Sequence, residues 1–461
     1  MARSSFLATV VVLAGCAAQA PGTGPLSVAI PSAWSQPAPA GELPLALWWH
    51  RFGDPLLVQL VEDSQRANSD VRIARANLRQ ARALRDLATA GLWPTLTVSG
   101  SAQRTRGGGV SGNLFDAGFD ASWEPDLFGA SAHAAGASQA QLQSSAASLS
   151  SIEVSIAAEV AVSYLQLRGA QARAEFAGKN LAAQEETLQI AQWREQAGLG
   201  TSLETAQARS AVEQTRAQLP VLAASIAQIG HALAVLTGQP PAALSTRLSV
   251  PAALPQAPQG LALAIPGLAL SQRPDVLVAE WQMRAQAERV AQADAQRLPS
   301  VQLRASVAWT ATTIGALGSV AAARSLLANA RQALFDHGLR NAQLAAQQAA
   351  FDAAQETYRA SVLAALQDVE DALAALAASR DRVTALHAAQ EATRDAALLA
   401  SNRYASGLID FQTVLDTQRT LLNVQDNVAS AETELATNHV RLYKALGGGW
   451  TPADLQPERS L

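Results

Sequence analysis

The chain contains few of the residues from which enzymes and nucleic-acid-binding proteins build their sites. Its 461 residues include one cysteine, 16% charged residues and 5% aromatic residues, and its net charge is -4. One cysteine excludes an internal disulfide and every metal site that needs several cysteines. Binding of nucleic acid requires clustered Lys and Arg to neutralise phosphates, so no nucleic-acid partner is expected.

Motifs that carry chemistry are also missing. The six histidines are scattered without metal-ligand spacing, and no nucleophile elbow or zincin pattern occurs. GGGVSG (residues 107–112) fits G-x-G-x-x-G, but it lies between strand-like segments and therefore indicates a hairpin turn. No run of about 20 apolar residues follows the N-terminal segment, so no transmembrane helix is expected. We expect no catalytic residue, no metal and no cofactor, and the chain is not expected to be an enzyme.

The single cysteine lies in a segment with the features of a secretory signal. A basic start precedes an apolar run from Phe6 to Ala14, which is shorter than the roughly 20 residues that span a bilayer. The sequence LAGC ending at Cys16 resembles the lipobox of bacterial lipoproteins. That resemblance implies cleavage after a signal peptide (1–15), diacylglycerol on the Cys16 sulfur, and acylation, as with palmitate, of the new N-terminus. The residue after the cysteine is Ala17 and not the aspartate that retains such proteins at the inner membrane, so the resemblance points to the outer membrane. The alternative is a small buried cysteine in an uncleaved segment.

Two long stretches lack proline and are rich in Ala, Leu, Gln, Glu and Arg. Pro125 and Pro220 bracket the first, and Pro299 and Pro452 bracket the second. Because proline costs a helix interior about 3 kcal/mol, these stretches predict long helices. In the second stretch apolar residues recur with coiled-coil spacing, at Val362, Leu366, Val369, Leu373, Leu376, Val383 and Leu386. In the first stretch a weaker apolar stripe consists of Ile156, Val160, Tyr164 and Leu167.

The chain also contains an internal repeat. Residues 68–94 align without a gap to 273–299 at an offset of 205, and residues 194–207 align to 403–416 at an offset of 209. Each half predicts a helix, an insertion that begins at a proline, a long helix, a glycine turn and another helix.

The insertions have the pattern of β-strands. Residues 95–105 and 300–310 alternate apolar and polar side chains over about the 9 to 11 residues of a membrane-spanning strand. The return strands, near 113–124 and 323–335, are less regular, and the second also fits a helix. A sheet of only four strands would expose unpaired backbone groups at its edges to lipid, so strands from other copies of the chain must complete the barrel. Three chains would supply twelve strands, an even number within the known range for outer-membrane barrels.

Several segments together resemble the outer membrane efflux family, the TolC-like outer membrane factors, and within it the NodT-type lipoprotein branch. The resemblance covers nearly all of the mature chain in the family's order. Its segments are LWWHRFGDPLL (47–57), SWEPDLFG (122–129), LAVLTGQPP (233–241), RPDV (273–276) and LYKALGGGW (442–450). It implies a mainly α fold with a small β part, and a homotrimer with a twelve-stranded β-barrel and a periplasmic α-helical barrel. Both hairpins look short for the family.

The repeat and the resemblance together divide the chain. The expected parts are the signal peptide (1–15), a lipidated extended segment with the start of the equatorial region (16–60), the first repeat (61–238), a Pro-rich equatorial linker (239–272), the second repeat (273–447) and a C-terminal tail (448–461). The hairpins are expected at about 94–128 and 299–337, and the tip turns at about 198–201 and 407–410.

The resemblance implies an outer-membrane exit duct that exports small compounds passively. Its implied partners are a periplasmic adaptor, an inner-membrane pump of the resistance-nodulation-division type, and outer-membrane lipid. The duct of a type I protein secretion system shares every feature above and stays an alternative. A lipid-anchored periplasmic helical scaffold is an alternative of another class, although it has no use for the strand-like insertions. The exported substrate cannot be read, because a wide duct has no fitted pocket.

The resemblance also assigns roles to four residues. Gly198 and Gly407 occupy the tip turns where adaptors dock, although a plain helix C-cap accounts for glycine equally well. Asp416 matches the aspartate whose threefold ring narrows the periplasmic aperture, and the alternative is an exposed helix aspartate. Three converging carboxylates would repel one another and attract cations. Gln412 stands at the aperture where the family often has an apolar residue.

Overall fold

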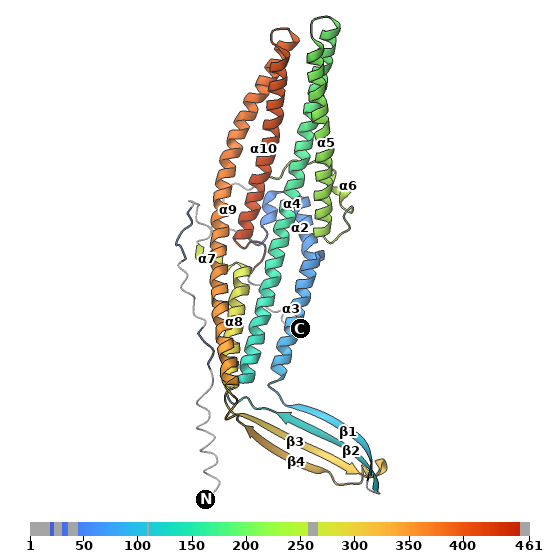
Figure 1. Ribbon diagram of the computed structural model, residues 1–461, viewed down its shortest axis with the longest axis vertical. Coiled ribbons are helices and arrows are strands. Elements are labelled where there is room, and N and C mark those ends of the chain that lie inside the picture. The colour runs from blue at the N-terminus through green and yellow to red at the C-terminus, as the bar shows by residue number, and fades with distance from the viewer. Residues whose placement is uncertain (1–18, 23–29, 36–44, 108–109, 257–265, 452–461) are drawn as a thin grey trace. The chain divides into compact units, whose positions relative to one another are not determined.

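The fold consists of long helices and one four-stranded sheet (Figure 1). The computed structural model describes residues 19–22, 30–35, 45–107, 110–256 and 266–451, and Cys16 lies outside them. The elements of the first half are η2 (Trp48–Phe52), α2 (Pro55–Ala67), α3 (Ser69–Ala90), β1 (Thr95–Gly107), β2 (Val110–Trp123), α4 (Ala130–Gln196), α5 (Ser202–Leu236) and α6 (Ser245–Leu248). Those of the second half are α7 (Pro266–Ser271), α8 (Pro274–Ala295), β3 (Ser300–Ala311), η3 (Ile314–Ala316), β4 (Ala323–Arg331), α9 (Leu339–Ala405) and α10 (Phe411–Ala445).

The two halves repeat the same elements at the same lengths. Helices α3 and α8 have 22 residues each, α4 and α9 have 67 each, and α5 and α10 have 35 each. Helix α8 begins 205 residues after α3, whereas α9 and α10 begin 209 residues after α4 and α5. The predicted structural repeat is therefore confirmed, and its four extra residues lie in the second insertion.

One proline does not bound a helix as the sequence pattern suggests. Pro220 lies inside α5, which continues through it to Leu236. Its ring is exposed, and a 35-residue helix can lose the one backbone hydrogen bond that proline cannot donate. The long helix therefore tolerates a residue that would end a short one.

The strands form a single antiparallel sheet in the order β1-β2-β3-β4. The two hairpins are joined where β2 pairs with β3, from Phe115 opposite Ala311 to Trp123 opposite Leu303. The return segment at 323–331 is strand β4, so its helical alternative is wrong. The strands have 13, 14, 12 and 9 residues, which reaches the length of about 9 to 11 that a tilted membrane strand needs. The hairpins are therefore long enough to cross a bilayer.

The chain divides into two compact units. The first contains the sheet with parts of four helices (76–147 and 277–361), and the second contains the described parts of 29–75, 148–276 and 362–461. In the first unit, Met283, Ala287 and Val290 of α8 pack against Phe351 of α9. The main core lies in the second unit and combines residues from both halves.

The segment LWWHRFGDPLL forms the centre of that second core. Trp48 and Trp49 are buried, and Trp48 stacks on Tyr443 of α10 with ring centres 5.4 Å apart. Asp54 caps α2 by accepting hydrogen bonds from its first backbone N–H groups, and its other oxygen accepts from the Tyr164 hydroxyl at 2.6 Å. Burial and this hydrogen bond raise the pKa of Tyr164 to about 12. One short segment thus fixes helices of both halves.

Two helices are more apolar than the sequence analysis expected. Helices α4 and α5 each contain an 18-residue window that is apolar enough, by length and composition alone, to cross a membrane. Neither helix contains a continuous run of about 20 apolar residues, and alanine and other small residues raise the mean hydropathy instead, so composition by itself places neither helix in a membrane. Of the α5 window, 11% is buried, and α5 exposes Val221 and Val235.

His439 makes the stability of the second unit depend on pH. It is 2% exposed on α10, and burial, together with the charges of Arg380 and Arg51, lowers its pKa from 6.5 to about 4. Between these values the unfolded chain binds a proton that the folded chain excludes. The free energy of unfolding therefore falls as the pH is lowered through this window, by about 3 kcal/mol in total.

We expect the melting temperature of His439→Gln to fall less steeply between pH 6.5 and about 4 than that of the wild type. His231→Gln is the matched control, because His231 is an exposed histidine of α5. Its slope should follow the wild type. Equal slopes for all three proteins would contradict the assignment to His439.

Candidate functional site

The two long helical hairpins end in the same turn. Gly198 after α4 and Gly407 after α9 both have a φ of +72°, which glycine adopts without strain. The N–H of the following leucine donates to the carbonyl five residues earlier, at 2.8 Å for Leu199 and 2.9 Å for Leu408. These hydrogen bonds form a Schellman C-cap, so backbone geometry by itself requires both glycines.

Apolar side chains are exposed around both turns. Leu199 and Leu408, which follow the glycines, are 71% and 74% exposed, and Leu203 and Trp193 are also exposed. Large apolar side chains gathered on a surface mark a contact site for another molecule. The structure therefore surrounds Gly198 and Gly407 with the kind of surface that a docking site needs.

Arg194 joins the two turns to each other. Its guanidinium donates to the carbonyl oxygen of Tyr404 at 3.2 Å and lies 4.7 Å from the centre of the Tyr404 ring. The hydrogen bond and the cation–π contact connect the end of α4 to the end of α9. In the sequence Arg194 is the first residue of the aligned segment 194–207, and nothing near it indicates a partner 210 residues away.

Polar pairs continue from this contact along α4 and α10. They are Thr187 with Gln418 (2.8 Å), Asn180 with Gln425 (2.6 Å), and Arg173 with Asp426 (2.6 and 3.2 Å). The α4 members and Arg194 recur every seventh residue, which is coiled-coil spacing with polar residues at the seam. The predicted apolar stripes do not include this seam, and the heptad of polar residues is the sequence signal that marks the α4 side of it.

Asp416 and Gln412 lie together on the exposed face of α10. The Gln412 amide donates to Asp416 Oδ1 at 3.0 Å, one helical turn away. Asp416 borders a groove of about 270 Å³ whose other lining residues are mostly threonines: Thr393, Ala396, Thr413, Thr417 and Thr420. The two predicted aperture residues are therefore neighbours, and the Asp416 carboxylate faces solvent beside hydroxyl groups.

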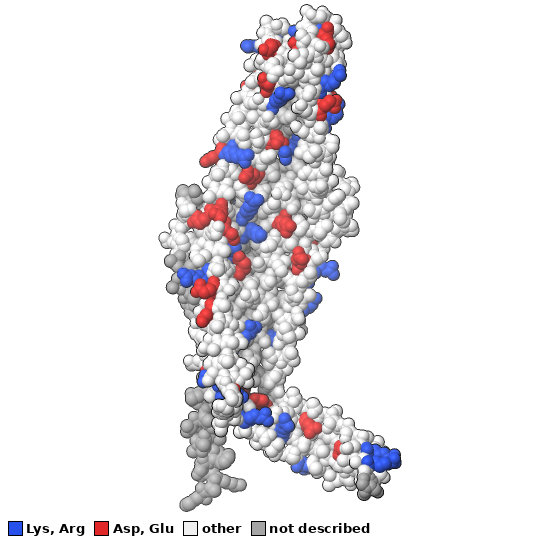
Figure 2. Space-filling view, viewed as in Figure 1, with Lys and Arg blue, Asp and Glu red and all other residues white. Residues whose placement is uncertain are grey.

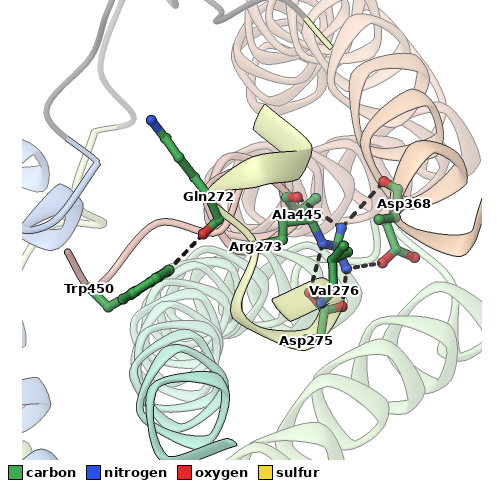
Figure 3. Close-up of polar contacts among 8 residues, drawn as sticks. Gln272, Arg273, Asp275, Val276, Asp368, Ala445 and Trp450 are labelled. Atoms are coloured by element: carbon green, nitrogen blue, oxygen red, sulfur yellow. Dashed lines mark hydrogen bonds and ion pairs between the residues drawn. The ribbon is translucent and has the colours of Figure 1, made fainter. Parts of the chain in front are cut away.

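The RPDV segment holds the start of α8 against α9 and α10 (Figure 3). Arg273 is 8% exposed and donates to Asp275 (2.6 and 3.0 Å), to Asp368 of α9 (2.9 Å) and to the carbonyl of Ala445 (2.8 Å). Burial opposes its charge, but the two carboxylates outweigh burial and raise the pKa of Arg273. Its bond to Ala445 also satisfies a carbonyl at the C-terminal end of α10, which has no partner within the helix.

The described residues contain no cluster of three or more His, Cys, Asp or Glu side chains that could hold a metal ion. The predicted lipidation residue, Cys16, is outside those residues. The arrangement at the hairpin ends consists of turns, an exposed carboxylate and a polar seam. It is suited to binding and to forming an aperture.

Comparison with known proteins gives consistent matches over almost the whole chain. The sequence model of the family described as "Outer membrane efflux protein" matches residues 60–239 and 265–448. The chain is similar to the pyoverdine export outer membrane protein OpmQ of Pseudomonas putida, with 33% identity over 454 residues that cover 95% of each chain. It is 29% identical to the toluene efflux pump outer membrane protein TtgI of Pseudomonas putida over 87% of each chain. The solved outer-membrane channel OprN is 36% identical over 94% of this chain and 100% of that chain, with a TM-score of 0.86.

The tip glycines can be tested against a helical glycine. Gly407→Ala should lower the free energy of unfolding by about 1 kcal/mol, because alanine is strained at a φ of +72° although a Cβ would have space there. Gly178→Ala, in open space within α4, should leave stability equal or higher by up to about 1 kcal/mol. Thermal or denaturant unfolding of both variants measures the difference. Equal effects at the two positions would contradict the backbone requirement.

Proposed function

Since the chain belongs to the outer membrane efflux protein family, we propose that three copies assemble into the exit duct of a tripartite efflux pump. The protein is an outer-membrane efflux channel, a passive duct and not an enzyme. In the proposed assembly the sheets form a twelve-stranded barrel in the outer membrane, and the long helices form a barrel across the periplasm.

The observation that best supports a trimer is that the sheet of one chain is open. Strands β1 and β4 each have one edge without a partner strand in the described chain. Backbone groups at such edges must be paired in lipid, and twelve strands from three copies would pair them all. The exposed apolar residues of α5 also support burial against neighbouring copies.

The proposed partners are a periplasmic adaptor and an inner-membrane pump of the resistance-nodulation-division type. The exposed leucines beside Gly198 and Gly407 support docking of the adaptor at the hairpin turns. Relatives are named for export of pyoverdine and of toluene, which favours efflux of compounds over protein secretion. Two such different exported compounds are consistent with a duct whose selectivity comes from the pump.

We assign the periplasmic aperture to Asp416 and Gln412. Their position a few residues after the α9–α10 turn, with the Asp416 carboxylate exposed, supports a ring of three carboxylates around the axis of the trimer. Such a ring would attract cations and narrow the entrance.

The aperture is tested by the conductance of single channels in planar bilayers. Asp416→Ala should raise the conductance and reduce the preference for cations, because it removes three converging charges. Asp381→Ala, an exposed aspartate elsewhere on α9, is the control and should match the wild type. If Asp416→Ala leaves the pore unchanged, the channel function is still supported, but the assignment of the aperture to Asp416 is rejected.

We further propose that Cys16 carries the lipid anchor in the inner leaflet of the outer membrane. Each buried CH₂ of an acyl chain contributes roughly 0.8 kcal/mol, so the anchor should help targeting more than it alters an inserted barrel.

Cys16→Ser should lose incorporation of labelled palmitate and reduce the amount of trimer in the outer membrane. The conductance of each remaining channel should equal that of the wild type. A full amount of outer-membrane trimer and unaltered export in Cys16→Ser would show that the anchor is dispensable.

A further inference from the structure

The two faces of the four-stranded sheet differ in chemistry. On one face, every residue of β1 at alternate positions from Thr95 to Thr105 is Thr, Ser or Gln. The opposite face carries apolar side chains in rows across the strands, among them Leu96, Val98, Phe119, Val307, Trp309 and Leu326. In a membrane barrel the apolar face contacts lipid and the polar face lines the lumen.

In the described strands, acidic side chains occur on only one of these faces, the polar one, which also carries Arg304 and Arg331. The carboxylates of Asp116 and Asp120 lie on the polar face, where they accept hydrogen bonds from Ser and Thr hydroxyls. The apolar face carries Arg104, Arg106 and Arg324 and, within the described strands, no Asp or Glu. All three arginines are exposed, and no carboxylate of the described chain pairs with them. A basic face without acidic partners calls for an anionic ligand from outside the chain.

Two of the arginines, Arg104 and Arg106, are placed beyond one end of the apolar face. From Val301 to Ala311 the apolar face of β3 extends over about 33 Å of strand, which at a tilt of about 40° gives the roughly 25 Å of a barrel's apolar band. Ala102 is level with Ala311 through Phe115. Arg104 and Arg106 lie about 7 and 13 Å farther along β1, at the height of the lipid headgroups.

Arg324 lies on the same face as Arg104 and Arg106, near the turn of its own, shorter hairpin. It is the second residue of β4 and follows the segment 312–322, which contains no charged residue. Its Cα pairs with Val307, within the apolar band, and its long side chain can extend towards the headgroups while its methylene groups stay in lipid. Figure 2 shows one group of Lys or Arg side chains at the far end of the sheet and others at points along it, with acidic side chains between them.

This end of the sheet faces the cell exterior in the proposed function. Strand β1 begins just after α3 and β2 ends just before α4, so the turn between them is the end farthest from the helices along the chain. The helices occupy the periplasm, and the turn therefore reaches the outer leaflet of the outer membrane. Lipid phosphates are the anions fixed at that height, and planar guanidinium groups bind phosphate by paired hydrogen bonds.

We propose that Arg104, Arg106 and Arg324 form a collar that binds the phosphates of phosphorylated glycolipid in the outer leaflet. The inference rests on the proposed membrane position of the sheet. It adds a specific lipid partner to the barrel, and in a trimer the collar contains nine arginines.

The test compares binding of two lipids to the purified trimer by native mass spectrometry. The probes are lipid A with its two phosphates and the same lipid after removal of the phosphates. The variant Arg104→Gln/Arg106→Gln/Arg324→Gln should bind phosphorylated lipid A at least about tenfold more weakly than the wild type. The control Arg304→Gln/Arg331→Gln changes two arginines of the polar face of the same sheet and should bind as the wild type does.

Several outcomes would overturn the collar. The first is that the collar variant and the wild type bind phosphorylated lipid A equally well. The second is that the wild type binds the two lipids equally well. The third is that the arginines bind inorganic phosphate and do not bind the lipid. Single-channel recording in phosphatidylethanolamine bilayers separates this failure from failure of the proposed function. If every variant forms pores but lipid phosphates do not affect binding, only the collar is rejected. If the folded wild-type trimer forms no pores, the proposed function is rejected, and the collar is rejected with it.

Discussion

The constraint on which the rest of this structure depends is the pairing of backbone groups at strand edges. Each chain contributes β1, β2, β3 and β4 to one sheet, and β1 and β4 keep an open edge. Lipid offers no hydrogen bonds to such edges, so a sheet of this kind is stable in a membrane only when it is closed. The pairing of β2 with β3 joins the two halves of the chain, and closure with further copies follows from the same requirement. Assembly is therefore a condition for insertion of the barrel.

The helices are held by a different balance of interactions. In the second unit, Trp48, Tyr443 and Tyr164 form a buried core, and Arg273 binds α8 to α9 and α10. Towards the hairpin turns the contact between α4 and α10 becomes polar, with Asn180 and Thr187 at its seam. Water can replace such hydrogen bonds at little net cost, whereas exposing the apolar core is expensive. At the turn end a second buried apolar cluster, which includes Tyr404, Phe411 and Leu415, also holds the helices together.

Charge is used sparingly and is placed by function. In the described strands the apolar face of the sheet carries arginines and no aspartate or glutamate, and the aspartates lie on the polar face. Near the start of α10, Asp416 is exposed beside threonines. None of these groups forms a fitted pocket for a substrate, which agrees with relatives named for export of different compounds.

The sequence by itself determined the repeat, the long helices and the strands. Its two offsets match the starts of α3 and α8 and of the later helices, because insertions cannot interrupt a helix without a break in the pattern. Ile156, Val160, Tyr164 and Leu167 are buried as their spacing predicts, since helical periodicity is local. Local pattern could not reveal the Arg194–Tyr404 contact, the α10 partners of the polar heptad of α4, or the contacts of Arg273 with Asp368 and Ala445. Those pairs join residues from about 90 to 250 positions apart, and only the tertiary packing brings their side chains together.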